Sequence, residues 1–208
     1  ISERPDSFPV CDDLTTIRIL RAATKDWDPA TNDYLILPRD RLLVSDYVLL
    51  TLRQLILAFP DEIDANRIRR ATNVADRLPG FCCMHCVMDR DHVTPSGRSF
   101  PSAPDNIASA LNSSLYSHLQ VCRYVAADLK LALANLRKIH SAQISSIKVG
   151  SQRRYFNLLF KRLNQFRRAE DRDSTASERS RCITDNGFIE TPAEEPDSSI
   201  VMCAECRM

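Results

Sequence analysis

Hydrophobic residues recur every three or four positions in several stretches of the chain, and this spacing predicts a mainly α fold. The clearest stretch is "SDYVLLTLRQLILAF", residues 45–59, where Ser45 can cap a helix and Pro60 can end it. A second helix is predicted to run from Asp105, as its N-cap, to Cys122. The other predicted helices cover residues 61–77, 127–148 and 152–168.

The two ends of the chain do not follow this helical pattern. Residues 1–40 contain four prolines and scattered apolar positions, so they are predicted to be mostly irregular, with short helix or strand pieces such as "LTTIRILRAA" at 14–23 and "DYLILP" at 33–38. Residues 169–199 are rich in Ser, Asp, Glu and Pro, which is typical of an acidic, disordered linker. The helical domain is therefore predicted to span 41–168, and residues 200–208 to begin a second cysteine module.

Composition is ordinary for a folded, soluble protein. The 208 residues are 44% hydrophobic and 26% charged, which allows one good core or two small ones. No run of about 18 uncharged apolar residues occurs, so neither a membrane span nor a membrane partner is predicted. The first residues, "ISERPDSFPV", lack an initiator Met and the features of an export signal, which suggests a trimmed or internal start. We expect an intracellular location.

The net charge of +1 conceals a strongly basic region. From Asp128 to Arg168 the sequence has ten Lys or Arg residues and one acidic residue, Asp128 itself. On the last predicted helix, Arg, Lys and Asn recur at steps of three or four, so most of them share one face. These side chains hold phosphates and reach base edges. The predicted nucleic-acid-binding residues are Arg153, Arg154, Asn157, Lys161, Asn164 and Arg168.

The cysteines carry the clearest chemistry. Cys83 and Cys86 form a CxxC pair, and thiols at this spacing on a turn converge on one metal ion. His118 and Cys122 follow after a gap of 31 residues, one helical turn apart on the flank of a predicted apolar stripe. A CxxC followed by an HxxxC is the two-plus-two pattern of tetrahedral structural zinc (Zn2+). The predicted fold is therefore a small helical domain with a zinc-stapled turn or short hairpin packed on helices.

Other interpretations of the first cysteine pair fit less well. Isolated cysteines are usually small core hydrophobes, but here four candidates stand in matched pairs. A redox motif needs an apolar strand before it and a helix that starts at its first cysteine, whereas Pro79-Gly80 and a loop-like segment flank this one. Two ambiguities remain open: Cys82 could replace Cys83, although the CxxC spacing favours Cys83, and either His85 or His92 could replace a ligand.

A second CxxC, Cys203 with Cys206, lies at the end of the chain. No HxxxC follows it, so it is interpreted most simply as the first half of another module that the chain does not complete. The alternative is that Cys182 and Cys11 help to complete it.

The order of "LPGFCCMHC", "GRSFPSAPDNIASALNSSLYSHLQVC" and "GSQRRYFNLLFKRL" resembles a group of diatom and other stramenopile proteins of uncharacterised activity. The likeness spans about residues 40–168 and implies a zinc site on the same two cysteine-containing pairs. The long gap and the HxxxC helix also resemble BED-type zinc fingers, which bind DNA. The aromatic residues expected ahead of the BED cysteine pair are not evident, so this second likeness is an analogy.

These observations predict a non-catalytic zinc module of the nucleus that binds DNA through its basic last helix. A solvated helix face would carry the same cations, and the alternative function is a protein-protein interaction or scaffold module. No Ser-His-Asp set, Gly-rich phosphate loop or paired buried carboxylates stands out, so neither an enzyme nor a small-molecule substrate is predicted.

Overall fold

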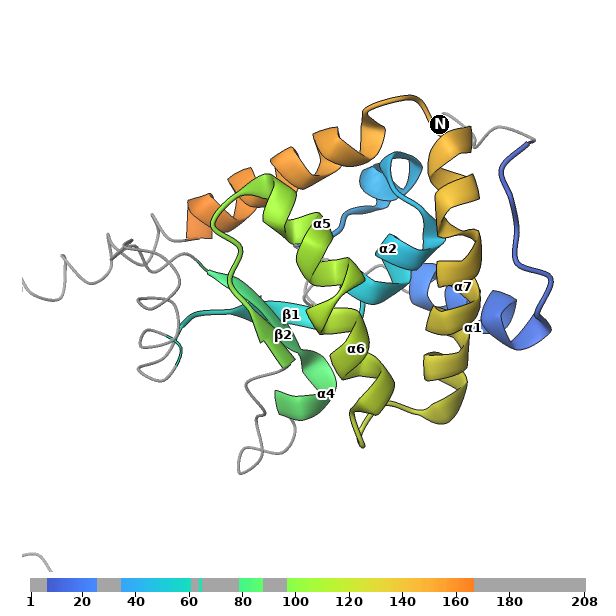
Figure 1. The fold of residues 1–208 in the computed structure, drawn as a ribbon, viewed down its shortest axis with the longest axis horizontal. Helices are drawn as coiled ribbons and strands as arrows, with labels where there is room; N and C mark the ends of the chain where they lie inside the picture. The colour runs from blue at the N-terminus through green and yellow to red at the C-terminus, as the bar shows by residue number, and fades with distance from the viewer. Residues whose placement is uncertain (1–6, 26–34, 61–63, 65–78, 88–96, 167–208) are drawn as a thin grey trace, which may run out of the picture. The chain divides into compact units, whose positions relative to one another are not determined.

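The computed structural model describes residues 7–25, 35–60, 64, 79–87 and 97–166. The chain divides into two compact units, residues 1–170 and 171–208, and every described residue lies in the first unit. Most described residues are helical, and a small three-stranded sheet lies beside the helices (Figure 1), which confirms the prediction of a mainly α domain. The predicted linker and second cysteine module lie outside the described residues.

The helices are α1 (Leu14–Lys25), α2 (Asp46–Leu52), α4 (Met84–Val87), α5 (Pro104–Asn112), α6 (Ser114–Val121), α7 (Ala127–Ser146) and a C-terminal helix over residues 151–166, with a 3-10 helix η1 at Pro38–Leu43. Among the described helices, none combines the length and the apolar character needed to cross a bilayer.

The sheet is antiparallel, in the order β1-β2-β3, and its strands are Leu55–Ala58, Gly80–Cys83 and Arg98–Ser99. The predicted continuation of the first helix to Phe59 is wrong, because α2 ends at Leu52 and β1 follows. Along β1, Leu55 pairs with Cys83 and Ala58 pairs with Gly80. Backbone hydrogen bonds with a strand distant in sequence therefore override the helical spacing of residues 55–58.

Helix α2 lies at the centre of the domain, and all seven of its residues are buried. Ser45 caps it as predicted, because its hydroxyl accepts the N–H of Val48 at 3.3 Å. Gln143 of α7 fixes the same end of α2: its carbonyl accepts the N–H of Asp46 and its amide donates to the Asp46 carboxylate, both at 2.9 Å. These bonds hold α7 against the start of the central helix.

The helix predicted from Asp105 to Cys122 is divided in two. Its backbone breaks at Ser113, which has φ −121° and ψ −87°, so α5 and α6 are separate helices. Ala103, not the predicted Asp105, occupies the N-cap position of α5, and Pro104 starts its first turn. The predicted stripe stays buried across the break, and its members are Ile107, Leu111, Leu115 and Leu119.

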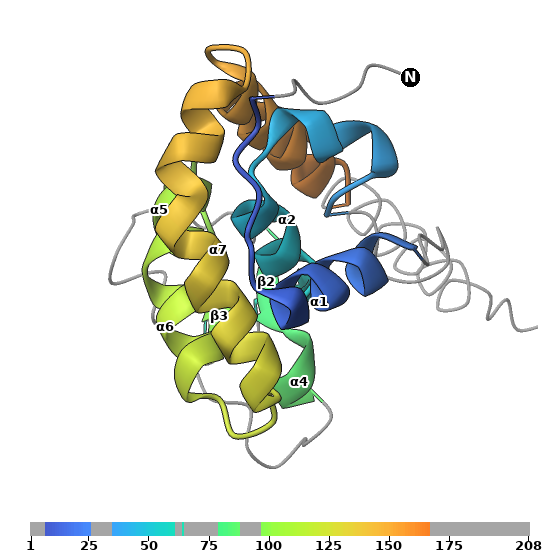
Figure 2. The same cartoon turned by 90° about the vertical axis from the view of Figure 1, so that its right-hand side faces the viewer.

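Helix α1 lies beside α7 (Figure 2). The carboxylate of Asp13 accepts both the backbone N–H and the hydroxyl of Thr16 at 2.7 Å, which satisfies the first turn and lowers the pKa of Asp13. Asn135 of α7 donates to the Thr16 hydroxyl at 3.4 Å. The short helix or strand piece predicted at 14–23 is thus a helix, α1, that contacts α7.

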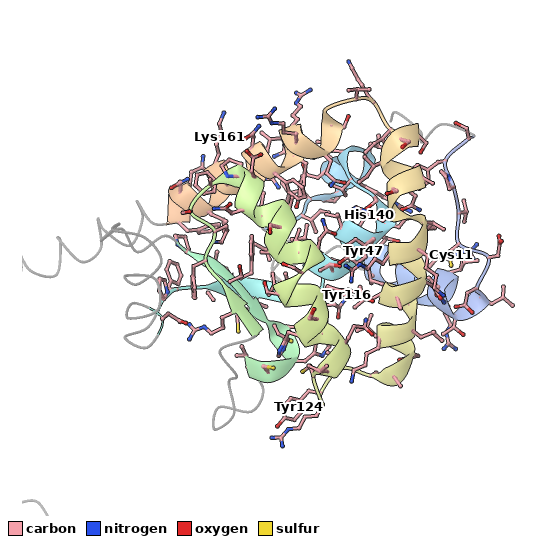
Figure 3. All side chains as sticks on the ribbon, viewed as in Figure 1. Cys11, Tyr47, Tyr116, Tyr124, His140 and Lys161 are labelled. Atoms are coloured by element: carbon pink, nitrogen blue, oxygen red, sulfur yellow. The ribbon has the colours of Figure 1, made fainter. Side chains whose placement is uncertain are left out.

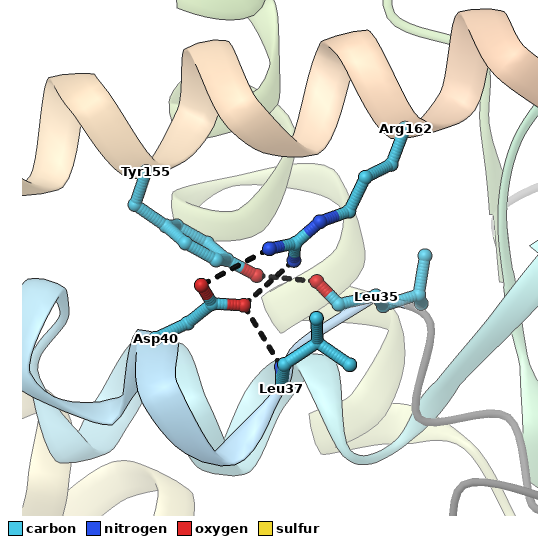
Figure 4. A network of polar contacts seen from close by, with 5 residues as sticks. All are labelled: Leu35, Leu37, Asp40, Tyr155 and Arg162. Atoms are coloured by element: carbon cyan, nitrogen blue, oxygen red, sulfur yellow. Dashed lines mark hydrogen bonds and ion pairs between the residues drawn. The ribbon is translucent and has the colours of Figure 1, made fainter.

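The C-terminal helix follows Gly150, whose φ of +80° favours glycine. Its apolar side packs into the core through Tyr155, Phe156, Leu159 and Leu163. A buried polar network also holds it (Figure 4): Arg162 donates two hydrogen bonds to Asp40 of η1, at 2.6 and 3.0 Å. We call this the Asp40 network; it comprises Leu35, Leu37, Asp40, Tyr155 and Arg162.

Candidate metal centre

The first ligand pair lies where β2 passes into α4. Cys83 is the last residue of β2, and Cys86 lies in the single turn of α4. Gln54, between α2 and β1, holds this turn twice: its backbone carbonyl accepts the N–H of Met84, and its side-chain oxygen lies 3.0 Å from Nε2 of His85. We call residues 83–86, which carry this ligand pair, the knuckle. Through Gln54, the knuckle is anchored to the segment that joins α2 to β1.

The second ligand pair lies at the C-terminal end of α6. His118 is in the last turn of the helix, and Cys122 occupies the C-cap position, where its N–H donates to the His118 carbonyl at 2.7 Å. The two side chains are separated by one helical turn and are both buried. Their spacing places both on the side of α6 that faces the knuckle.

The two pairs converge. The four ligand atoms, one from each residue, all lie within 4.8 Å of one another, and all four residues are buried. Sγ of Cys86 is 3.2 Å from Nε2 of His118 and 3.5 Å from Sγ of Cys122. All three cysteines are free thiols. Cys83, Cys86, His118 and Cys122 could therefore hold one metal ion, as predicted from their spacing.

The electrostatics of the pocket suit such an ion. Burial raises the pKa of Cys83, and hydrogen bonds from the N–H groups of Cys86 and His85 to its sulfur offset part of that rise. Burial and the neighbouring thiol of Cys122 raise the pKa of Cys86. Burial, followed by the nearby charge of His85, lowers the pKa of His118, which favours the neutral imidazole that metals bind. A bound cation would supply the positive charge that buried thiolates need.

The ambiguities left by the sequence are largely resolved. Cys82 lies on the opposite face of β2, where it pairs with Ile56 and Arg98, and burial raises its pKa to about 11. His85 is outside the cluster and contacts Gln54 instead. Cys11 is half-buried against the core and is not part of the cluster either. The remaining candidates lie outside the described residues: His92, Cys182, Cys203 and Cys206.

The predicted basic face is only partly described. Arg153, Arg154, Asn157 and Lys161 are exposed on the C-terminal helix, and Figure 3 shows Lys161 on its outer side. Asn164 is half-buried, and its amide donates to the Phe160 carbonyl at 2.9 Å. Arg168 lies outside the described residues.

Sequence reasoning missed two residues that organise these surfaces. Gln54 anchors the knuckle, yet it is a single amide in a hydrophobic stretch and carries no local signal. Arg162 was counted among the cations of the last helix, but it turns inward to Asp40, which is 122 residues away along the chain. Both contacts join segments that are far apart in the sequence, so only the folded structure identifies them.

Comparison with protein-family models, with curated proteins and with solved structures finds no match for this chain. The resemblance to the stramenopile proteins therefore stays a prediction.

Proposed function

We propose that Cys83, Cys86, His118 and Cys122 bind one zinc ion with a structural role. The observation that carries the proposal is the convergence of their four buried ligand atoms within 4.8 Å. Three sulfurs and one imidazole nitrogen are a donor set that zinc takes in tetrahedral structural sites. Four protein ligands leave no coordination position for a substrate, which favours a non-catalytic module.

The proposed role of the ion is to fasten the knuckle to α6. The cysteines of the knuckle and the ligands of α6 are separated by more than thirty residues. Closing such a loop costs conformational entropy, and zinc binding supplies free energy toward that cost. The thiolates and the neutral imidazole bind the ion, while Gln54 orients the knuckle that presents two of them.

We further propose that the zinc-fastened domain binds DNA through the C-terminal helix. Supporting this, Arg153, Arg154 and Lys161 are exposed, and residues 151–166 contain no Asp or Glu. Lys148 adds an exposed cation just before the helix. Clustered cations of this kind contact phosphates and displace counterions, which produces binding that weakens steeply with salt.

The zinc proposal is tested by metal content. We expect one zinc per chain, measured by inductively coupled plasma mass spectrometry, in protein whose tail cysteines Cys203 and Cys206 are changed to serine. Cys86→Ser in that background should remove the zinc, because the Cys86 sulfur contacts both Nε2 of His118 and the sulfur of Cys122. Cys82→Ser is the matched control and should retain it. Equal zinc content in both variants would contradict the assigned ligand set.

The DNA proposal is tested by charge reversal. Fluorescence anisotropy with random-sequence duplex DNA should show binding at low salt, and Arg153→Glu with Lys161→Glu should weaken it at least about tenfold. If each cation meets one phosphate, the slope of log affinity against log salt should fall by about 1.8.

The matched control reverses two exposed cations on α1, Arg18→Glu with Arg21→Glu, which changes the net charge equally. Equal losses in the two double variants would contradict a DNA surface on the C-terminal helix. Absence of binding by the unaltered protein at low salt would reject the DNA proposal and favour the protein-interaction module.

A further inference from the structure

Gly97 lies directly against the ring of His118. A Cβ atom at this position would be 2.9 Å from both Cε1 and Nε2 of the imidazole and 3.4 Å from Cδ2. Real Cβ atoms are essentially never closer than 3.0 Å to a neighbour, so any other residue here would force a movement. The edge of the ring that Gly97 touches is the edge that carries the ligand nitrogen.

The backbone does not demand glycine at this position. Among the described glycines, only Gly150 has a positive φ, so alanine could adopt the main-chain conformation of Gly97 without strain. Space for the imidazole is therefore the reason for a glycine here. Gly97 also begins the "GRSFP" segment that leads through β3, and β3 packs on α6.

The ring has little room to yield. His118 is only 4% exposed, and its Nε2 also lies 3.2 Å from the sulfur of Cys86. The imidazole edge is thus close both to Gly97 and to the sulfur of Cys86. A methyl group at Gly97 would be relieved most easily by rotating the ring, and rotation would carry Nε2 away from the sulfurs.

We propose that Gly97 is a positioning residue for the metal centre, which holds open the space that lets His118 ligate through Nε2. This inference rests on the proposed zinc site. It assigns a role in metal binding to the turn before β3, which contributes none of the four ligands. Residues that orient metal ligands typically change metal affinity by about 10-fold to 100-fold when they are altered.

The test is Gly97→Ala in the full chain with Cys203 and Cys206 changed to serine. Zinc affinity, measured by competition with a chromophoric chelator, should fall at least about tenfold. Absorption of the cobalt-substituted protein should lose intensity in its d–d bands if the geometry departs from tetrahedral. Gly150→Ala is the matched control, because it strains the backbone in open space and should leave zinc affinity within twofold of the unaltered value.

A second pair of variants separates a clash with the ring from general damage to β3. In a His118→Cys background no imidazole is present, so adding Gly97→Ala should change zinc affinity by less than about twofold. A tenfold loss with either residue at position 118 would overturn the proposal, as would unchanged affinity of the single variant. Circular dichroism of each variant in its metal-free form checks that the variant folds.

Zinc binding by the unaltered protein distinguishes failure of the zinc proposal from failure of the Gly97 proposal. Unaltered protein that takes up no zinc would reject the metal centre itself, and the role of Gly97 would fall with it. Unaltered protein that binds zinc tightly beside an equally tight Gly97→Ala variant would reject the positioning role alone.

Discussion

The candidate metal centre and the Asp40 network differ in how their buried polar groups are stabilised. Each joins segments that are far apart in the sequence through buried polar groups. In the Asp40 network a carboxylate and a guanidinium neutralise each other, and the carboxylate also accepts the N–H of Leu37 at 2.9 Å. In the metal centre three thiols and one imidazole face each other, and burial opposes ionisation of Cys83 and Cys86.

If the four ligands bind zinc as proposed, this part of the domain depends on a ligand from outside the chain, whereas the Asp40 network does not. Burial alone would lower the pKa of Arg162, but the hydrogen bond and charge of Asp40 raise it above its ordinary value, so the protein itself stabilises this cation. The four candidate ligands are three thiols and an imidazole whose pKa is lowered, so they supply no positive charge of their own. We therefore expect stability to depend on metal at one site and to be independent of it at the other.

Removal of the metal should have the largest effect. At a free zinc concentration about 1,000 times the dissociation constant, zinc binding contributes about 4 kcal/mol, so chelation should lower Tm by about 10 °C. Helicity at low temperature should be largely retained, because α2, α7 and the C-terminal helix contribute apolar side chains of their own to the hydrophobic core. Thermal unfolding followed by circular dichroism, with and without chelator, measures both quantities.

Cys82→Ser is the control for that experiment, and it should respond to the chelator as the unaltered protein does. If the Tm of the unaltered protein did not change with chelator, stability would not depend on metal at either site, and the expected difference between the two sites would be wrong.

Asp40→Asn should have the next largest effect. It keeps an acceptor for Leu37 but removes the charge opposite Arg162, and breaking a buried ion pair typically costs about 3–5 kcal/mol. Because the Arg162 side chain is 17% exposed, we expect about 2 kcal/mol, measured by urea unfolding. The loss should be the same with and without chelator, since the two sites share no residue.

A loss at Asp40 that vanished after chelation would show that the two sites are coupled. Replacing both partners, Asp40→Leu with Arg162→Leu, should recover part of the lost free energy, because no unpaired charge then remains.

The smallest expected effect is a loss of stability at acidic pH through His140. Burial, followed by the charge of Arg137, lowers the pKa of His140, whose Nδ1 lies 2.7 Å from the Ser45 hydroxyl. A proton therefore binds the unfolded chain more readily than the folded one. The contribution of this group to stability is complete above the ordinary histidine pKa of about 6.5 and is lost as pH falls from there through the lowered value.

His140→Gln should flatten this part of the pH profile. The measurement is the difference in urea-unfolding free energy between the variant and the unaltered protein from pH 8 to pH 5, because protonation of the metal ligands affects both proteins. A difference that stays constant across this range would contradict the role of His140.

Local spacing was enough to predict a large part of this protein. The three- and four-residue steps predicted the mainly α fold, and the cap by Ser45 is confirmed. The same rule placed His118 and Cys122 one turn apart, and the CxxC placed Cys83 beside Cys86. The sequence erred where a distant partner decides the conformation: residues 55–58 have helical spacing, but their backbone pairs with β2.

By itself, then, the sequence determined the four ligand types and their spacing within each pair, because helix and turn periodicity are properties of neighbouring residues. The CxxC spacing favoured Cys83 over Cys82, but only the tertiary structure decided which of the two faces the cluster, since the register of β2 assigns its faces. The tertiary structure also decided that Arg162 turns inward while Lys161 stays exposed. Both choices depend on groups brought together by packing, and packing joins residues that no local pattern connects.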